Sequence, residues 1–484
     1  MPFARNYNDH SSDSILAYAR KLENHNLHQL LSDDVELQTV KGKGSFGILL
    51  EKYYFGYEPN SNPTPDFSNN NVSLELKSSP LHELKNGQLR VKERLVLGMI
   101  NYHKIIEETF ENSSFISKNI SLLLVFYIWK KNTSPMLLRI KKVGLWKIPD
   151  SDKLIIKADW ILIQSKIKNG KAHELSEGDT IYLGACTKGS TAVKSQTSQP
   201  CSEILAKRRA FSYKTSYVNF IYSQISTETS DFDNIIRNPQ DLIENNFESL
   251  IQKKFNPYFG LTTDEIEQKL GVVLNKNNKS YYAQLTNEIL GISSSKKPAE
   301  FEKANILFRT IRVEKNEKIK QSISFTPFKF NNIYDNEWED SEIRETIERK
   351  FFFVFYKSDG ESFRLSKTLF WNMNIEELKE FEDIYNRTRK VIQEGRIVKE
   401  IKNGKTLNNF PKIKDSFLGH VRPHAKNKHD VLPLPVPDIL TKQETFTKQS
   451  FWLNNHCTPE TKEKSRIFNY LLVTKQPIAS LWPL

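Results

Sequence analysis

Apolar and polar residues alternate most clearly at residues 72–77, Val-Ser-Leu-Glu-Leu-Lys. Side chains of an extended strand change face at every residue, so Leu74 and Leu76 share one face and Glu75 and Lys77 share the other. The pattern therefore predicts a strand whose leucines enter a core. It also places an acid and a base side by side on the opposite face.

The remaining apolar pattern predicts a protein of mixed α and β structure. Apolar positions three and four residues apart predict helices at residues 14–31, 43–55 and 151–168. Glycines follow the second and third of these segments, at Gly56 and Gly170, and favour a helix end there. Short apolar runs predict further strands at residues 122–127, 137–140 and 180–183.

The chain also contains an internal repeat. Three segments of the first half have echoes in the second half: residues 121–127 in 351–356, 182–188 in 419–425, and 210–213 in 449–452. A length of 484 residues suits two domains. We expect a first domain at residues 1–225, a polar and acidic connector at 226–258, and a second domain at 259–484. The alternative is two unrelated domains whose strands look alike.

The second copy lacks the charged residues of the first. Matching Pro65 to Pro298 without gaps sets neutral residues opposite charged ones: Ala299 opposite Asp66, Phe308 opposite Glu75 and Thr310 opposite Lys77. A matching helix sets Asn287 at about the place of Glu51. The second domain is therefore expected to be catalytically silent.

The charged face of the first strand suits metal-assisted hydrolysis of a phosphodiester. Asp66, which follows Pro65 in the preceding loop, can join Glu75 around a hard divalent cation, for which carboxylate oxygens are preferred ligands. Lys77 then lies beside the metal-bound water, where an ammonium helps to neutralise developing charge. The alternative is an ion pair on a half-exposed strand, because 26% of the residues are charged.

The surrounding motifs resemble a known nuclease family. Residues 43–51 read Lys-Gly-x-x-Gly-x-Leu-Leu-Glu and are followed by Pro65-Asp66 and by Glu75-Leu76-Lys77. This string resembles the mismatch-repair endonuclease MutH and the type II restriction endonucleases with tandem MutH-like domains that cut at GATC. Further matching segments are residues 92–97, 122–127, 182–189 and 209–214. The resemblance implies two tandem PD-(D/E)xK domains, of which the second is degenerate and binds a second DNA site that activates the first.

The resemblance also implies roles for individual residues. Asp66 and Glu75 would bind Mg²⁺ with help from the Leu76 carbonyl, and Lys77 would orient or deprotonate the attacking water. Glu51 would support the site, although its helical spacing alone favours a surface position. The expected DNA contacts are Lys43, Lys188, Arg209 and Lys214 in the first domain, and Arg422, His424 and Lys426 in the second.

Two basic loops are the candidates for reading DNA. The loop at residues 419–424 resembles the MutH segment that enters the DNA groove, so Arg422 is the best candidate for reading bases at the second site. In the first domain, Cys186 stands where MutH has its base-reading arginine, and Lys188 either reads bases or only touches phosphate. A zinc site at His420, His424 and His429 is disfavoured, since basic residues alternate with them and no cysteine is near.

Composition adds weaker evidence. The 70 Lys and Arg exceed the 58 Asp and Glu, giving a net charge of +12 and a pI near 9.2, which favours a polyanionic partner. Three cysteines without a Cys-x-x-Cys pair argue against a disulfide framework and a zinc ribbon. No apolar run approaches a membrane span and the N-terminus lacks a signal-peptide core, so a cytoplasmic bacterial protein is expected.

Together these features favour a Mg²⁺-dependent type II restriction endonuclease that cuts both strands of duplex DNA at GATC and leaves 5′-phosphates. GATC is symmetric and one centre cuts one strand, so two chains are expected to dimerise on the DNA. A cognate DNA methyltransferase is the expected functional partner. The alternatives are a strand-nicking repair endonuclease and a non-cleaving DNA-binding regulator.

Overall fold

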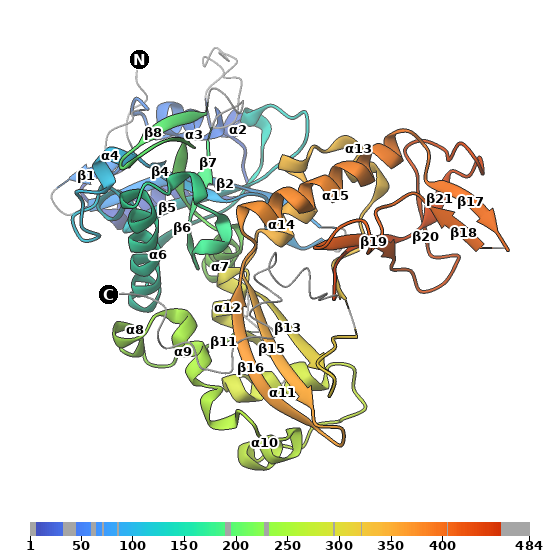
Figure 1. The fold of residues 1–484 in the computed structure, drawn as a ribbon. Coiled ribbons are helices and arrows are strands. Elements are labelled where there is room, and N and C mark those ends of the chain that lie inside the picture. The colour runs from blue at the N-terminus through green and yellow to red at the C-terminus, as the bar shows by residue number, and fades with distance from the viewer. Residues whose placement is uncertain are drawn as a thin grey trace. The chain divides into compact units, whose positions relative to one another are not determined.

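The structure is a computed structural model in which the chain forms two compact units (Figure 1). It describes residues 6–31, 45–59, 64–69, 72–84, 87–188, 195–226, 232–293, 296–320, 322–403 and 405–455. The first unit contains residues 1–253 and 290–306, and the second contains residues 254–289 and 307–484.

A mixed sheet forms the centre of the first unit. Its strands are β1 (Phe67–Asn69), β2 (Val72–Glu83), β5 (Ser121–Ile128) and β6 (Ile140–Lys147), in the order β1-β2-β5-β6, and β3 (Leu89–Val91) pairs with the far end of β2. Strands β2 and β5 run parallel, whereas β6 is antiparallel to β5. The strand predicted at residues 72–77 is thus confirmed as the start of a longer strand, and the strand at 122–127 is confirmed as β5.

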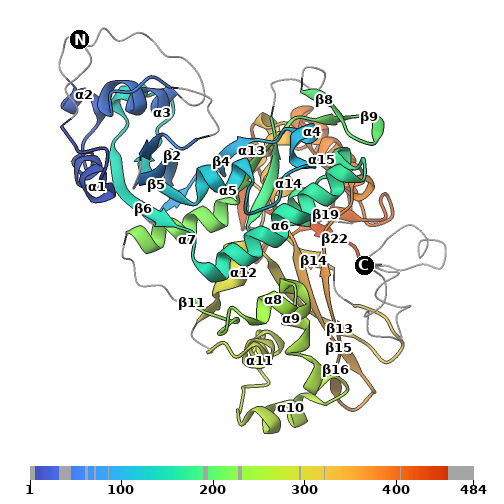
Figure 2. The ribbon, with the colours of Figure 1, turned by 90° about the vertical axis from the view of Figure 1, so that its left-hand side faces the viewer.

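Short helices lie against this sheet, as Figure 2 shows. They are α1 (Ser12–Arg20), α2 (Leu27–Leu30), α3 (Ser45–Leu49) and the π-helix η1 (Leu50–Tyr54). Leu74 and Leu76 are buried in one cluster with Phe46, Leu50 and Leu123 from these helices and from β5. The face of β2 opposite this cluster is therefore the one that carries Glu75 and Lys77.

Two of the predicted helices differ from the expectation in detail. The helix expected at residues 14–31 is two helices, because the chain turns at residues 21–26 with Asn24 at a φ of 66°. The described part of the helix expected at 43–55 changes from α to π geometry after Leu49 and stops at Gly56, whose φ is 72°. The glycine stop is therefore confirmed, and the π-turn places Glu51.

A second, three-stranded antiparallel sheet completes the first unit. It has the order β4-β10-β7, with β4 (Leu95–Met99), β10 (Arg209–Tyr213) and β7 (Leu183–Thr187). Helix α6 (Asp150–Lys168) packs on β7 and ends before Gly170, as predicted. Around these elements lie α4 (Tyr102–Ile105), α5 (Ser114–Asn119), α7 (Thr215–Ile225) and the hairpin of β8 (Gln196–Gln199) and β9 (Ser202–Lys207).

Two predicted strands begin later than expected. Residues 135–137 form a short 3₁₀ turn, and the strand expected at 137–140 starts at Ile140. The strand expected at 180–183 starts at Leu183, because the buried Asp159 carboxylate of α6 accepts the backbone N–H groups of Ile181, Tyr182 and Leu183.

The first unit also takes in chain that the sequence suggested for the connector and the second domain. Residues 232–253 carry α8 (Asp241–Glu244) and α9 (Phe247–Lys253), and β11 (Phe232–Asp233) pairs in parallel with β12 (Lys297–Pro298). Helix α12 (Ala299–Ala304) packs on α7. The segment 290–306 is therefore part of the first unit, although the sequence suggested the second domain.

The second unit is built on two sheets as well. The larger one has the order β13-β15-β16, from β13 (Leu307–Val313), β15 (Phe351–Ser358) and β16 (Phe363–Trp371), and Figure 1 shows α11 (Tyr281–Leu290) alongside it. The smaller one is β14 (Ile323–Ser324), β22 (Gln449–Leu453) and β19 (Gly419–Pro423). The other elements are α10 (Thr263–Leu270), α13 (Phe330–Asp335), α14 (Glu342–Ile347), α15 (Ile375–Gln393) and the hairpins β17 (Val398–Lys402) with β18 (Lys405–Asn408) and β20 (Val431–Pro433) with β21 (Thr445–Thr447).

The two units repeat one topology. In each, a parallel strand pair is followed by an antiparallel strand, a 19-residue helix (α6 or α15) and two strands of a three-stranded antiparallel sheet. The other strand of that sheet, β4 or β14, lies in the sequence between the two parallel strands. The antiparallel pairing is irregular at the same place, between Phe126 and Tyr127 in the first unit and between Phe355 and Tyr356 in the second. The mixed α/β class and the internal repeat are thus both present in the structure.

In both units, a carboxylate of the long helix accepts backbone N–H groups at the start of one strand of the three-stranded sheet. Asp159 of α6 accepts N–H groups just before and at the start of β7, and Glu380 of α15 accepts the N–H groups of Phe417 and Leu418 just before β19. Burial raises the pKa of Asp159 to about 6, against the lowering effect of those backbone N–H groups. The shared contact shows that the long helices occupy equivalent places in the two units.

No helix in the described part of the chain is both long enough and apolar enough to cross a membrane.

Candidate active site

The charged residues of β2 lie at the parallel contact with β5. Glu75 is opposite Leu122 and Lys77 is opposite Leu124. Glu75 is only 2% exposed although it is an acid, and the Lys77 side chain is 22% exposed. A buried carboxylate requires hydrogen bonds or a counter-charge, so the contacts of Glu75 define the site.

Asp66 and Glu75 are held together across the β1-β2 hairpin. The backbone N–H of Asp66 donates to Oε2 of Glu75 at 3.2 Å. In return, the backbone N–H of Leu76 donates to Oδ2 of Asp66 at 2.9 Å. These two bonds fix both carboxylates at one place, at the end of the loop that the sequence predicted to deliver Asp66.

Two lysines compensate the charge of Glu75. The ammonium of Lys77 forms a hydrogen-bonded ion pair with Oε1 of Glu75. The ammonium of Lys118, on α5, lies 3.4 Å from the same oxygen, and its side chain is 17% exposed. Sequence reasoning missed Lys118, because no motif contains it. Its only signal was its place in the short helix immediately before strand β5.

Glu51 belongs to the same group of charges. Burial raises the pKa of Glu51 to about 7; Asp66 and Glu75 raise it as well, while Lys77 and Lys118 lower it. Burial is also the largest cause that raises the pKa of Glu75, with Lys77 acting in the opposite direction. The π-helical turn therefore brings Glu51 to the acids of β2 rather than to solvent, and π-turns occur frequently at functional sites.

The donor set fits a hard divalent cation. The hydroxyl of Tyr57 is buried and has no hydrogen-bond partner among the described residues. Burial is the largest cause that raises the pKa of this hydroxyl, and the negative charges of Asp66, Glu51 and Glu75 raise it further. Within the described residues no three carboxylate, histidine or cysteine side chains form a complete metal cage. Mg²⁺ usually needs only one or two carboxylates and takes waters and substrate oxygens as its other ligands, which the pair Asp66 and Glu75 satisfies.

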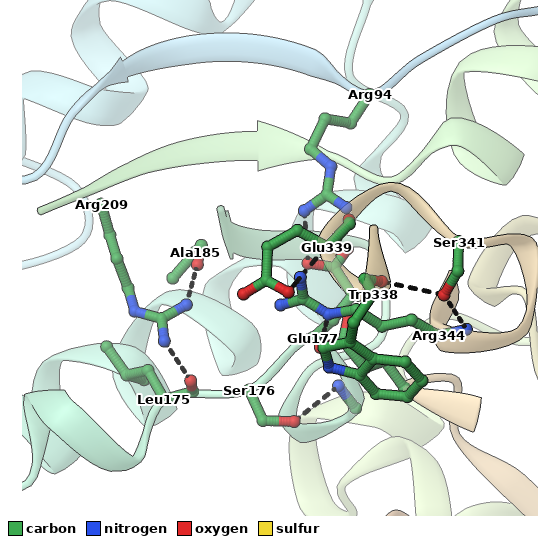
Figure 3. Close-up of polar contacts among 12 residues, drawn as sticks. Arg94, Leu175, Ser176, Glu177, Ala185, Arg209, Trp338, Glu339, Ser341 and Arg344 are labelled. Carbon is green, nitrogen blue, oxygen red and sulfur yellow. Dashed lines mark hydrogen bonds and ion pairs between the residues drawn. The ribbon is translucent and has the colours of Figure 1, made fainter. Parts of the chain in front are cut away.

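The basic residues expected to bind DNA in the first unit have different environments. Lys43 lies outside the described residues, and Lys188 follows β7 with its side chain partly exposed. Arg209 donates to the carbonyls of Ala185 and Leu175, as Figure 3 shows. The ammonium of Lys214 donates to the Thr180 carbonyl at 2.6 Å, and this residue is 5% exposed. Because both cations have internal partners, we leave Arg209 and Lys214 out of the proposed DNA contacts.

The corresponding loop of the second unit is more accessible. Arg422 is exposed and its guanidinium lies 3.8 Å from the centre of the Trp452 ring. His424 is exposed and shares a 2.9 Å hydrogen bond with Ser450, and Lys426 is exposed. Arg422 of β19 lies opposite Ser450 of β22, and Cys186 of β7 lies opposite Ala210 of β10. Arg422 and Cys186 therefore occupy matching places in the two units.

Comparison with known proteins agrees with this geometry. A family model described as DNA mismatch repair enzyme MutH matches residues 55–159. The type II restriction enzyme Sau3AI of Staphylococcus aureus is 35% identical in an alignment over 452 residues that covers 86% of this chain and 91% of that protein. The chain belongs to the Sau3AI family of type II restriction enzymes. As a member of this family it is a site-specific deoxyribonuclease.

The MutH family model matches the part of the chain that contains the charged cluster. The residues matched by the MutH model include Asp66, Glu75, Lys77 and Lys118, which are the residues that the structure brings together. The match to Sau3AI covers most of both proteins and therefore extends over both repeats.

The raised pKa of Glu51 predicts a pH-dependent cost to folding. In the metal-free protein, folded Glu51 holds its proton up to about pH 7, whereas an unfolded Glu releases it near its ordinary pKa of 4.5. The folded state therefore binds more protons in this window, and stability falls as the pH rises through it. We expect Glu51→Gln to raise the melting temperature relative to wild type more at pH 8 than at pH 5. Equal shifts at both pH values, or the same trend for the exposed control Glu203→Gln, would contradict the assignment.

Proposed function

We propose that this enzyme is a Mg²⁺-dependent restriction endonuclease that hydrolyses both strands of duplex DNA at GATC and leaves 5′-phosphate ends. The observation that carries the proposal is the pair Asp66 and Glu75, hydrogen-bonded across the β1-β2 hairpin with Lys77 and Lys118 beside them. This cluster of carboxylates and ammonium groups suits phosphodiester hydrolysis. A purely structural ion pair would not need Glu51, a further acid whose burial costs stability.

Asp66 and Glu75 would hold the metal, with the backbone of Leu76 next to Asp66 as a further source of an oxygen ligand. Bound Mg²⁺ supplies a Lewis acid that makes water a better nucleophile and neutralises negative charge on the phosphate. Metal binding requires both carboxylates in their charged form, and burial raises the pKa of Glu75. Affinity for the metal should therefore increase with pH.

Lys77 would orient the attacking water through its ammonium group and stabilise the charge that develops on the phosphate; to take the proton of the water it would first have to release its own. Its ion pair with Glu75 keeps its amine at the metal ligands, so it needs no large movement to reach the reacting group. Lys118 approaches the same oxygen from α5 and provides a second positive charge. Glu51 would position one of these lysines or a water.

The second unit would bind a second GATC-containing DNA without cutting it, and thereby activate the first. Its exposed loop offers Arg422 and Lys426 together with His424, and a stack on Trp452 keeps the guanidinium of Arg422 ordered before DNA arrives. Arginine can then make paired hydrogen bonds to guanine at little entropic cost. Lys43 and Lys188 are the proposed contacts in the first unit.

Two chains would meet on the substrate, since a single catalytic centre cuts one strand of a symmetric site. The host would need protection of its own GATC sites by a cognate DNA methyltransferase.

A plasmid with two GATC sites distinguishes the candidate functions. Incubation with Mg²⁺ should give linear fragments with 5′-phosphate ends. Nicked circles would support a strand-nicking repair endonuclease, and intact plasmid with retarded mobility would support a DNA-binding regulator. A plasmid without GATC is the matched control and should remain intact.

A further inference from the structure

The strand pairing identifies the residues of the second unit that stand at the catalytic positions. In the first unit, Leu122 of β5 pairs with Glu75 of β2 on one side and with Trp146 of β6 on the other. In the second unit, Phe351 of β15 pairs with Leu307 of β13 on one side and with Trp371 of β16 on the other. The pairing irregularity falls four residues further along in both strands, after Phe126 and after Phe355. Leu122 therefore corresponds to Phe351, so Leu307 stands at the place of Glu75.

By the same register, Arg309 stands at the place of Lys77, since Lys77 pairs with Leu124 and Arg309 pairs with Phe353. The gapless match of the sequence had suggested Phe308 and Thr310, one residue further along. The register corrects this match, because a slip of one residue moves every side chain to the other face of the sheet. The two repeats differ before the strand, where the β1-β2 hairpin of one is replaced by α12 in the other.

Two acids of the catalytic repeat, Glu75 and Glu51, have neutral counterparts in the second unit. Leu307 replaces Glu75, and Asn287 of α11 replaces Glu51 in the helix match. Ile347 precedes Phe351 by as many residues as Lys118 precedes Leu122, and it is fully buried. Arg309 is thus the one charge that this site retains among the matched positions.

Arg309 lies in an apolar environment and forms no ion pair with another of the described residues. Its strand neighbours on the same face, Leu307 and Ile311, belong to or pack against the aromatic core of the second unit. Its one hydrogen bond within the described residues runs from Nη1 to the Phe308 carbonyl at 2.9 Å. Burial lowers the pKa of Arg309, and no acid acts on it. A half-buried cation without a neighbouring acid destabilises the folded state. The presence of Arg309 at this position therefore points to an anionic ligand that binds it.

We propose that Arg309 binds a phosphodiester group of uncleaved DNA in the second repeat, at the place that corresponds to the scissile phosphate in the first. A guanidinium offers paired donors that match phosphate oxygens, and the neutral residues at the places of Glu75 and Glu51 remove two carboxylates that would bind a metal or repel the anion. Among the described residues, β13 pairs only with β15 and is therefore an edge strand of its sheet. The inference rests on the proposed DNA binding by the second unit.

The test is calorimetric titration of the full chain with a GATC duplex in EDTA, so that no cleavage occurs. Wild type should show two classes of site. Arg309→Met should weaken one class about 10-fold and lower its salt slope by about one, whereas Arg309→Lys should keep the slope. Arg312→Met is the matched control, because Arg312 is exposed on the opposite face of the same strand, over the Tyr282 ring.

The outcomes separate the two proposals. Two classes that Arg309→Met leaves unchanged in affinity and salt slope would overturn the role of Arg309 and keep the second DNA site. A single class in wild type would overturn both. An equal loss for Arg309→Met and Arg312→Met would also overturn the specific role of Arg309, since any basic residue of the strand would then suffice.

Discussion

Replacing Lys77 by Ala should lower the rate of DNA cleavage by about 10²–10⁴-fold while DNA binding is retained. The ammonium of Lys77 is paired with Glu75, one of the two proposed metal ligands, and faces the same side of β2. Its loss removes the group that orients water and stabilises charge, but removes none of the residues proposed to contact bases. Single-turnover cleavage and binding of the same duplex without metal measure the two effects separately.

Lys142→Ala is the matched control for this variant. Lys142 lies on β6 of the same sheet, and its ammonium is 3.4 Å from a carboxylate oxygen of Glu23 with both side chains partly buried. Its removal should leave the cleavage rate within a few-fold of wild type. Cleavage by Lys77→Ala at the rate of the control would refute the role assigned to Lys77.

Replacing Lys303 by Ala should destabilise the first unit by about 3–5 kcal/mol. Lys303, on α12, pairs with Asp152 of α6 at 3.0 Å, and both residues are buried. The ammonium also lies 4.2 Å from the centre of the Phe220 ring, and Tyr217 donates a 2.9 Å hydrogen bond to the same carboxylate. The substitution leaves Asp152 charged and buried without its cation, which is the costly way to break such a pair.

Chemical denaturation of the full chain measures this loss in the transition of the first unit. The exposed Lys297, just before α12, gives the control Lys297→Ala, which should change the stability by less than about 0.5 kcal/mol. The double variant Lys303→Met with Asp152→Asn should recover part of the loss, because no charge remains buried. A loss under 1 kcal/mol for Lys303→Ala would show that residues 290–306 are not anchored as described.

Local pattern was sufficient for much of the fold. The alternation at residues 72–77 predicts that Glu75 and Lys77 share one face of β2, because the leucines of the other face enter the core. The positive φ of Gly56 and Gly170 explains why two helices end where these glycines predict. The site residues on β2 followed from that alternation together with the motif that contains Asp66.

The remaining features depend on contacts between residues distant in sequence. Lys118 reaches Glu75 only because α5 precedes the strand that pairs with β2, and no periodicity encodes this. The one-residue error in matching the repeats arose because α12 replaces a hairpin, so the gapless match lost register before β13. The same helix holds residues 290–306 in the first unit through Lys303, a contact between residues 151 positions apart.

The metal site can be tested most directly in a crystal of the enzyme with a GATC duplex and Mn²⁺ in place of Mg²⁺, in which anomalous scattering locates the metal. We expect a peak between the carboxylates of Asp66 and Glu75 next to a phosphate of the DNA, and none beside Leu307 and Arg309 in the second repeat. A first repeat in which Asp66 and Glu75 lie apart with no metal between them would refute the proposed catalytic site.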